Sequence, residues 1–264
     1  MIKLDAFGYT RVRCLVNQEN QHYPLMEAVI DLQIPGHIYV NDGEIESAFI
    51  CSLDGWAYLI GNKENERFNQ ELIEHIKEKH GNQLIWFGAD EIIKNTILKQ
   101  IEGKIEDYPR YCFKFNEESF NQTQIEHKGK LEVFPYTIEE INKGNLSRAS
   151  SFSDCLPKFW KDSRKFLEEG IGYIALDKGQ VIGEVISASI NRQQEVEIDI
   201  HTDEQYRRQS VAEMLCRNLI KQCLDEGKTP KWDCVMTNTA SKRLAFKLGF
   251  EIVKEYPVTF IQFK

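Results

Sequence analysis

Hydrophobic positions in the first half of the chain alternate between strand spacing and helix spacing. Runs rich in β-branched and aromatic residues predict strands at residues 37–40, 46–52, 56–60, 83–88 and 111–115. Between them Phe68, Leu72 and Ile76 recur at helical spacing and predict a helix over residues 66–79. A second helix is expected over residues 91–101. The first half therefore predicts an α/β layer of its own, in which we find no catalytic motif.

A polar stretch over residues 115–130 is interpreted as a linker. Beyond it the pattern predicts strands at 131–134, 173–176, 181–190, 195–202, 232–236 and 250–263, the last with a break near Pro257. Helices are expected at 138–143, 157–169, 210–226 and 240–248. The whole chain is expected to be an α/β protein of two lobes, with domains at residues 1–125 and 126–264.

Composition and charge narrow the classes of partner. Of the 264 residues, 33 are Lys or Arg and 41 are Asp or Glu, so the formal net charge is −8. This balance argues against a nucleic-acid partner, which needs clustered Lys and Arg, and suits a cationic or small-molecule partner. No run of 18 apolar residues and no signal-peptide pattern is found, so we expect neither a membrane partner nor secretion. No feature of the sequence indicates the oligomeric state.

Seven cysteines are present, and none forms a Cys-x-x-Cys pair or lies at metal-ligand spacing from a histidine. Cys216 and Cys223 share one face of a predicted helix, two turns apart, which is too far for a disulfide. We expect them to be small buried hydrophobic residues. The sequence therefore predicts no metal site and a reducing, cytoplasmic compartment.

The junction between the strand at 195–202 and the helix from Ser210 is a candidate phosphate site. A helix N-terminus has unpaired backbone N–H groups and a partial positive charge, and both favour bound phosphate. Arg207 and Arg208 add two cations immediately before this helix.

The residues of this junction also resemble a family. Tyr206-Arg207-Arg208-Gln209-Ser210-Val211-Ala212 is similar to the pyrophosphate loop of GNAT acetyltransferases, an Arg/Gln-x-x-Gly-x-Gly/Ala pattern. Trp232-Asp233-Cys234, Asn238-Thr239-Ala240-Ser241 and Leu244-Ala245-Phe246-Lys247-Leu248-Gly249-Phe250 follow in the family's order and resemble its zwittermicin-A-resistance branch. The resemblance covers roughly residues 131–264. It implies a C-terminal GNAT-like mixed sheet flanked by helices, and the N-terminal strand–helix order is reminiscent of a degenerate copy.

The resemblance implies an N-acetyltransferase that moves the acetyl group of acetyl-coenzyme A to an amine of a small molecule. The residues it implies for binding this cosubstrate are His201, Thr202, Arg207, Arg208, Gln209, Ser210, Val211, Ala212, Asn238 and Ser241. For His201 and Thr202 it implies backbone contacts, as if the ligand were an added strand. Capping of the next helix would explain Asn238 equally well.

Two positions depart from the family pattern. Ser210 stands where the family has a glycine, and it adds a Cβ while supplying an N-cap hydroxyl that could bond phosphate. Ala245 stands where many members have a tyrosine that protonates the leaving thiolate. That proton must then come from elsewhere.

A general base is sought on the strand before the loop, where alternation places Glu195, Glu197, Asp199 and His201 on one face. A solvated strand face would account for these residues if the strand lay at an edge. In a central strand the carboxylates would be covered, and because burying a carboxylate is costly, their presence would need a functional explanation. We expect Glu197, and after it Asp199, to deprotonate the amine, directly or through water.

Two other functions stay open. The departures at Ser210 and Ala245 suit a non-catalytic sensor that binds acyl-coenzyme A. An aminoacyl transferase with a double GNAT-like fold would need a tRNA-sized basic surface, which the net charge of −8 argues against. No motif identifies the acceptor amine.

Overall fold

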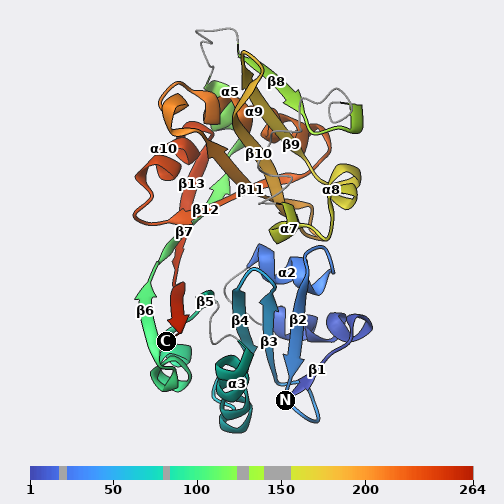
Figure 1. Ribbon diagram of the computed structural model, residues 1–264, viewed down its shortest axis with the longest axis vertical. Coiled ribbons are helices and arrows are strands. Elements are labelled where there is room, and N and C mark those ends of the chain that lie inside the picture. The colour runs from blue at the N-terminus through green and yellow to red at the C-terminus, as the bar shows by residue number, and fades with distance from the viewer. Residues whose placement is uncertain (18–22, 80–83, 124–130, 140–155, 264) are drawn as a thin grey trace. The chain divides into compact units, whose positions relative to one another are not determined.

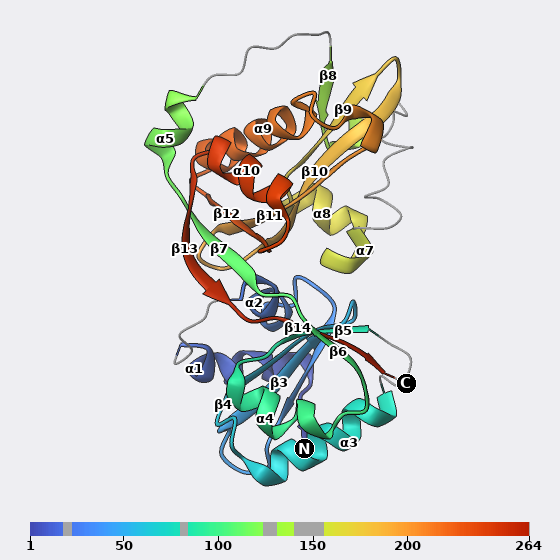
Figure 2. The same ribbon diagram turned by 90° about the vertical axis from the view of Figure 1, so that its left-hand side faces the viewer.

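The computed structural model describes residues 1–17, 23–79, 84–123, 131–139 and 156–263. The chain divides into two compact units, residues 1–110 with 255–264 and residues 111–254. Each unit contains a seven-stranded mixed sheet with helices packed on it (Figures 1 and 2). The predicted α/β class is thereby confirmed.

The first unit is built on a sheet of order β1-β2-β3-β4-β5-β14-β6. The strands are β1 (Ile2–Lys3), β2 (Gly36–Val40), β3 (Ser47–Ser52), β4 (Trp56–Gly61), β5 (Leu84–Gly88), β6 (Gly103–Asp107) and β14 (Thr259–Phe263). The helices are η1 (Ala6–Val12), α1 (Arg13–Val16), α2 (Pro24–Ile30), α3 (Glu66–Lys79), α4 (Glu91–Thr96) and η2 (Leu98–Gln100). Helices α3 and α4 share one apolar core with the sheet, whereas α1 and α2 share a second.

The second unit has the order β13-β7-β12-β11-β10-β9-β8. Its strands are β7 (Arg110–Phe115), β8 (Glu132–Pro135), β9 (Gly172–Asp177), β10 (Gln180–Ile190), β11 (Glu195–Thr202), β12 (Thr229–Val235) and β13 (Phe250–Tyr256). Its helices are α5 (Glu117–Gln122), α7 (Leu156–Phe159), α8 (Ser163–Glu169), η4 (Glu204–Tyr206), α9 (Val211–Asp225) and α10 (Thr239–Lys247).

The two faces of the second sheet are covered differently. The apolar face of α9 packs its Leu215 and Leu219 against Val185 and Val196, and all four side chains are fully buried. The opposite face carries a smaller cluster around Trp160, covered by α7 and α8 (Figure 2). The face beneath α7 and α8 is also the face that bears Asp199, which stands opposite Ile186 of this cluster.

Most predicted elements are present, and the differences have local causes. The helix expected over 157–169 is two helices, because Asp162 accepts a hydrogen bond from the Lys165 N–H and caps α8 afresh. The helix expected over 138–143 lies largely outside the described residues. Strand β6 and the helices before residue 35 were not predicted.

The predicted boundary at residue 125 differs from the division of the structure. The supposed linker contains α5, which Asn116 caps by accepting from the Ser119 N–H. Helix α5 docks closely on Gly249, where a Cβ atom would stand 2.6 Å from the Phe120 nitrogen. Residues 111–123 therefore belong to the second unit. The contacts place the two boundaries after residues 110 and 254.

The expected last strand, residues 250–263, is also two strands in two different sheets. Pro257 interrupts it, since proline has no N–H to donate to a sheet. Strand β13 stays in the second sheet, whereas β14 pairs with both β5 and β6 of the first. The chain therefore passes from the first unit to the second and back again.

The described cysteines are all free, and Cys216 and Cys223 are fully buried as predicted. Burial raises the pKa of the Cys223 thiol to about 12 and also raises that of Cys216. Cys155 lies outside the described residues. Among the helices of the described ranges, none combines the length and the apolar character needed to cross a membrane.

Candidate active site

The parallel strands β11 and β12 are paired over a short stretch. Their register runs from Glu195 opposite Thr229 to Glu197 opposite Lys231. Beyond that pair, β11 continues to Thr202 and β12 to Val235, and the described residues show no further pairing between them. The second half of β11 therefore presents an unpaired edge on this side.

The backbone groups at this edge are identified by the pairing on the other side of β11. The Asp203 N–H donates to the Ile182 carbonyl at 3.0 Å, which continues the antiparallel register with β10. In an antiparallel ladder, residues whose backbone groups bond to the partner strand alternate with residues whose groups point away from it. The odd-numbered residues of β11 therefore bond to β10. The N–H and C=O groups of Ile198, Ile200 and Thr202 accordingly point toward the β12 side. The last β11–β12 pair uses the Ile198 N–H, and the Thr202 carbonyl accepts from Arg207. The Ile198 carbonyl, both backbone groups of Ile200 and the Thr202 N–H can hydrogen-bond an extended ligand as an added strand would.

Of the two residues predicted to contact the ligand through their backbone, Thr202 lies on this edge. Its buried Oγ1 has no hydrogen-bond partner in the described structure. His201, by contrast, stands opposite Glu184, and the same alternation turns its backbone toward β10. Its side chain is exposed.

The loop after β11 has a backbone that leaves its amides unpaired. Arg208 and Ser210 both adopt left-handed conformations, with φ of 62° and 63°. Helix α9 follows, and its first described bond is from the Met214 N–H to the Ser210 carbonyl. For residues 208–212, no backbone N–H donates a hydrogen bond of normal length and angle to a described acceptor, although residues 207–210 form a weakly bonded turn. Successive free amides at a helix N-terminus form a concave anion site.

The conformation of Ser210 explains why the family pattern has a glycine there. A left-handed backbone costs an L-residue roughly 1–2 kcal/mol, whereas glycine adopts it freely. The Ser210 side chain makes no N-cap hydrogen bond to the described backbone. Its hydroxyl is exposed at the loop, together with Gln209.

The two arginines of the loop are arranged differently. Arg207 contacts Glu204 at 3.1 Å, and its Nε donates to the Thr202 carbonyl at 3.4 Å. Its guanidinium thus ties the loop to the end of β11. Arg208 is exposed and makes no ion pair with any described residue. Arg208 is therefore the better placed of the two to meet an incoming anion.

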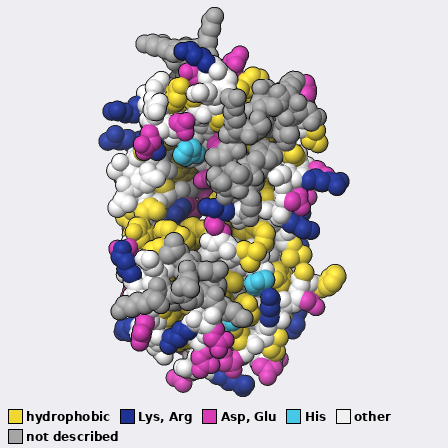
Figure 3. Space-filling model, viewed as in Figure 1, with side chains coloured by type: hydrophobic (Ala, Val, Ile, Leu, Met, Phe, Trp, Pro, Cys, Tyr) yellow, Lys and Arg dark blue, Asp and Glu magenta, His cyan; other side chains and the backbone are white. Residues whose placement is uncertain are grey.

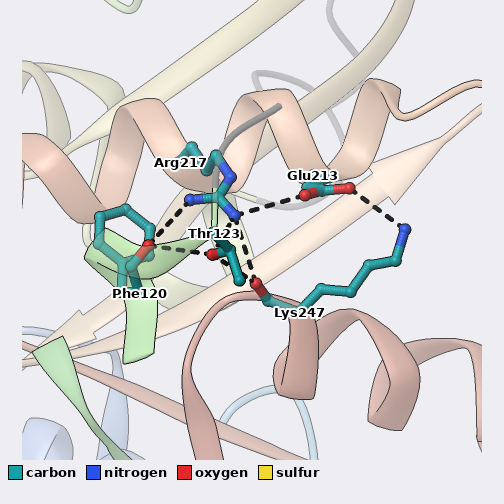
Figure 4. Close-up of polar contacts among 5 residues, drawn as sticks. All are labelled: Phe120, Thr123, Glu213, Arg217 and Lys247. Atoms are coloured by element: carbon teal, nitrogen blue, oxygen red, sulfur yellow. Dashed lines mark hydrogen bonds and ion pairs between the residues drawn. The ribbon is translucent and has the colours of Figure 1, made fainter. Parts of the chain in front are cut away.

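Helix α9 is held by a buried arginine in its middle (Figure 4). Arg217 donates to Thr123 Oγ1 at 2.6 Å and to the Lys247 carbonyl at 3.3 Å, and it contacts Glu213 at 3.4 Å. Its guanidinium also lies over the Phe120 ring, 4.9 Å from the centroid. These contacts join α9 to α5 and to the end of α10. They fix the helix whose N-terminus forms the anion site.

Asn238 and Ser241 lie at the start of α10. The Asn238 side-chain oxygen accepts from the Ser241 N–H at 3.0 Å, so the capping interpretation is confirmed. The Ser241 hydroxyl accepts from the Trp232 indole N–H at 3.1 Å. The Asn238 side-chain NH₂ makes no hydrogen bond within the described residues and is exposed. Capping therefore leaves this donor available for a ligand.

The candidate base lies on the face of β11 opposite α9. Asp199 is the first residue of that face beyond the last β11–β12 pair, so its carboxylate stands beside the unpaired edge. Burial raises the pKa of Asp199, and the nearby carboxylate of Glu184 raises it further. His201, the Ile200 N–H and Lys158 act in the opposite direction. Such a shift brings a carboxyl group closer to the working range of a general base.

Glu197 lies one pair earlier, within the paired part of β11. It is half-buried and stands opposite Ser189, whose fully buried hydroxyl has no partner in the described residues. The sequence ranked Glu197 ahead of Asp199. Because the open edge begins only after Glu197, the geometry favours the reverse order.

Sequence reasoning missed two residues of this face, Glu184 and Tyr136. The Tyr136 hydroxyl donates to Glu184 at 2.9 Å within the protein interior. A carboxylate inside the apolar run Val181–Ile190 is a signal that could have been noticed.

Ala245, at the family's tyrosine position, lies on the buried side of α10 and is fully buried. Because alanine has no hydroxyl, this position cannot protonate a thiolate.

Comparisons with known proteins show which family and which folds the chain is similar to. A family model described as GNAT acetyltransferase matches residues 14–259. An uncharacterized N-acetyltransferase of Bacillus subtilis (strain 168), YdfB, is 25% identical over 235 residues, covering 88% of this chain and 87% of its own. A GCN5-related N-acetyltransferase-like protein from Streptococcus suis 89/1591 has a similar fold, with a TM-score of 0.72 and 23% identity over 97% of this chain and 99% of its own. A tandem GNAT protein from the clavulanic acid biosynthesis pathway has a TM-score of 0.64 and 10% identity, covering 99% and 97% of the two chains.

The left-handed backbone of Ser210 predicts the effect of two substitutions. Ser210→Gly should raise the free energy of unfolding by about 0.5 kcal/mol, because the relieved strain exceeds the entropy cost of glycine. Ser210→Val should lower it by about 1 kcal/mol or more, since a β-branched residue fits this conformation poorly. Urea denaturation measures both. As a control, Ser163→Gly within α8 should destabilise, so a gain there would contradict the explanation.

The raised pKa of Asp199 predicts a pH-dependent stability. At acidic pH the folded protein holds the Asp199 proton more tightly than the unfolded chain does. As the pH rises from the ordinary Asp range through the raised pKa, the wild type should therefore lose stability. Asp199→Asn removes this loss and should be more stable than the wild type at pH 7, with the difference shrinking toward pH 4. Equal stability of the two proteins at every pH would contradict the shift.

Proposed function

The chain belongs to the GNAT acetyltransferase family, and from this premise we propose that it transfers the acetyl group of acetyl-coenzyme A to an amine of a small molecule. The observation that carries the proposal is the junction of β11 and α9. There, unpaired amides at the helix N-terminus adjoin an unpaired strand edge. This combination suits a ligand with a phosphate end and an extended amide-containing arm.

The residues present fit acetyl-coenzyme A. The amides of residues 208–212 and the guanidinium of Arg208 would hold the pyrophosphate, as an anion at a helix N-terminus. The edge of β11 from Ile198 to Thr202 would hydrogen-bond the pantetheine arm, and the side-chain NH₂ of Asn238 would add a donor. The bound group supplies an acetyl thioester.

Within the described residues, the start of α3 in the first unit shows no equivalent phosphate site. There β4 pairs in parallel with β5, and the helix after β4 is α3. At the start of α3 the Asn65 side chain already accepts from the Phe68 N–H, and Glu66 adds a negative charge to the first turn. Both features oppose an anion. We infer that the first unit is the degenerate copy and that the cosubstrate binds to the second.

The chemistry requires a neutral amine, because an alkylammonium with a pKa of about 10.4 has no free lone pair. Asp199 would accept the proton of the amine, directly or through water, and return it to solvent. The amine nitrogen then forms the new N–C bond and gives up its second proton to water, while the C–S bond breaks. The sulfur leaves as a thiolate and takes a proton from water, since Ala245 cannot donate one. Glu197 is the second candidate for the base.

The alternatives are less well supported. An acyl-coenzyme A sensor would explain Ala245, but it gives no reason for placing Asp199 beside the open edge. An aminoacyl transferase would need a broad basic surface. On the face in Figure 3, Lys and Arg side chains are scattered among Asp and Glu rather than gathered in one field. Membership of the zwittermicin-A-resistance branch and a reducing, cytoplasmic location remain part of the proposal.

The phosphate site is tested by adding a negative charge to it. The wild type should show a clear thermal shift with acetyl-coenzyme A, since a ligand at 100 times its Kd stabilises by roughly 2.7 kcal/mol. Ser210→Asp should fold but lose most of this shift, because its carboxylate would repel the phosphates. Ser210→Gly should keep it. Differential scanning fluorimetry measures all three.

Ser163→Asp provides the matched control for that experiment. It places the same charge at the N-terminus of another helix of the second unit, α8, and should leave the shift with acetyl-coenzyme A intact. If Ser210→Asp and the wild type showed equal shifts, the phosphates would bind elsewhere and the proposed function would lose its basis.

The base is tested by a pair of isosteric substitutions. Asp199→Asn should lower the turnover number for thiol release by about 10²–10⁴, the usual contribution of a general base. The thermal shift with acetyl-coenzyme A should persist. The acceptors to screen are aminoglycosides, polyamines, amino-polyol antibiotics and amino acids. Normal turnover in Asp199→Asn together with a loss in Glu197→Gln would assign the base to Glu197.

A further inference from the structure

A second carboxylate is buried beside the proposed base. Glu184 lies in the middle of β10 and is 3% exposed. It stands opposite His201, and Asp199 stands opposite Ile186, the next residue of β10 on the same face. Glu184 and Asp199 are therefore diagonal neighbours across the two strands. In a poorly solvated place the charge of one such neighbour acts on the other.

Tyr136 fixes this second carboxylate. Its hydroxyl donates to Glu184 Oε2 at 2.9 Å, and the bond is buried. The tyrosine is itself held by a hydrogen bond from its N–H to the Gly172 carbonyl at 2.9 Å and by an edge contact with the Phe166 ring. A buried donor of this kind holds the carboxylate in one orientation.

The other charged or titratable groups that act on Asp199 come from three further places. His201 follows it on β11, and Lys158 approaches from α7. The Cys216 thiol of α9 also interacts with it. His201 and Lys158 favour the charged form of Asp199, whereas Glu184 opposes it. Among these groups Glu184 has the largest effect, and it is the one held by a buried hydrogen bond.

We propose that Glu184, held by Tyr136 on the strand beside Asp199, is a positioning residue that acts through Asp199 in the proposed proton transfer. The inference rests on the proposed function. Glu184 itself is too deeply buried to meet the acceptor. Its negative charge makes Asp199 a stronger base than an isolated aspartate, which would deprotonate an ammonium poorly. Pairs of carboxylates with different environments divide such roles in other active sites.

The experiment compares the wild type with Glu184→Gln and Tyr136→Phe. Glu184→Gln keeps the shape and removes the charge, so Asp199 should titrate at lower pH. The acidic limb of the turnover profile should move in the same direction, and turnover at pH 8 should fall by up to about tenfold because the base is weaker. Tyr136→Phe removes a donor that orients Glu184, and it should give the same changes to a smaller degree.

Two measurements separate this role from a structural one. The first is the pH profile of thiol release, with the acceptor that reacts fastest in the amine screen. The second is the titration of the Asp199 carboxyl carbon by ¹³C NMR in the free protein, assigned with Asp199→Asn. The matched control is Tyr173→Phe, which removes a half-buried hydroxyl bonded to Gln222 at 2.7 Å. It should move neither the profile nor the titration.

The outcomes are distinguishable. A lower titration midpoint and a shifted acidic limb in Glu184→Gln, with Tyr173→Phe unchanged, would support the inference. If acetyl transfer occurs but both midpoints of Glu184→Gln match those of the wild type, the inference is overturned while the proposed function stands. If Tyr136→Phe does not fold, Glu184→Gln alone decides. If the wild type transfers acetyl to no amine of the screen, the proposed function fails, and the catalytic role of Glu184 fails with it.

Discussion

The early separation of β11 from β12 is the constraint on which the candidate site depends. Full pairing would close the edge of β11 with backbone hydrogen bonds and leave no place for an extended ligand. Strand β11 stays in place without this pairing because its other side is paired with β10 along its length. That register runs from Val196 opposite Ile190 to Thr202 opposite Gly183. The strand is thus held from one side and open on the other. The loop with the free amides begins where this open edge ends.

The strained loop is possible because both of its flanks are rigid. β11 is fixed by β10, and α9 is fixed by its buried apolar face and by the contacts of Arg217. Two residues of the loop, Arg208 and Ser210, can then be held in left-handed conformations that an isolated peptide would avoid. The same conformations turn successive amides in one direction. The strain is therefore confined to the residues that are proposed to bind the phosphates.

The sequence predicts those features that are encoded locally. The bounds of α3 and β11 are predicted correctly because apolar spacing and β-branched content mark them, and the loop is found through its residue pattern. No local pattern tells which sheet a strand joins, so the passage of β14 into the first sheet is missed. Tyr136 and Glu184 are 48 residues apart, and their hydrogen bond forms only in the tertiary structure. The unpaired edge likewise depends on how two strands diverge.

The cost of burying carboxylates argues that this face of the sheet is a site rather than a structural layer. On the α9 face of the same strands, Val185, Val196 and Ile198 are buried, and their packing stabilises the fold. Opposite them, Glu184 and Asp199 are neighbouring carboxyl groups that repel each other when both are charged, and burial raises the pKa of Asp199. Apolar residues at these positions would remove this repulsion and add packing. A protein under selection for stability alone would not keep both carboxylates there. A protein that must take a proton from an ammonium beside the open edge of β11 has a reason to keep them.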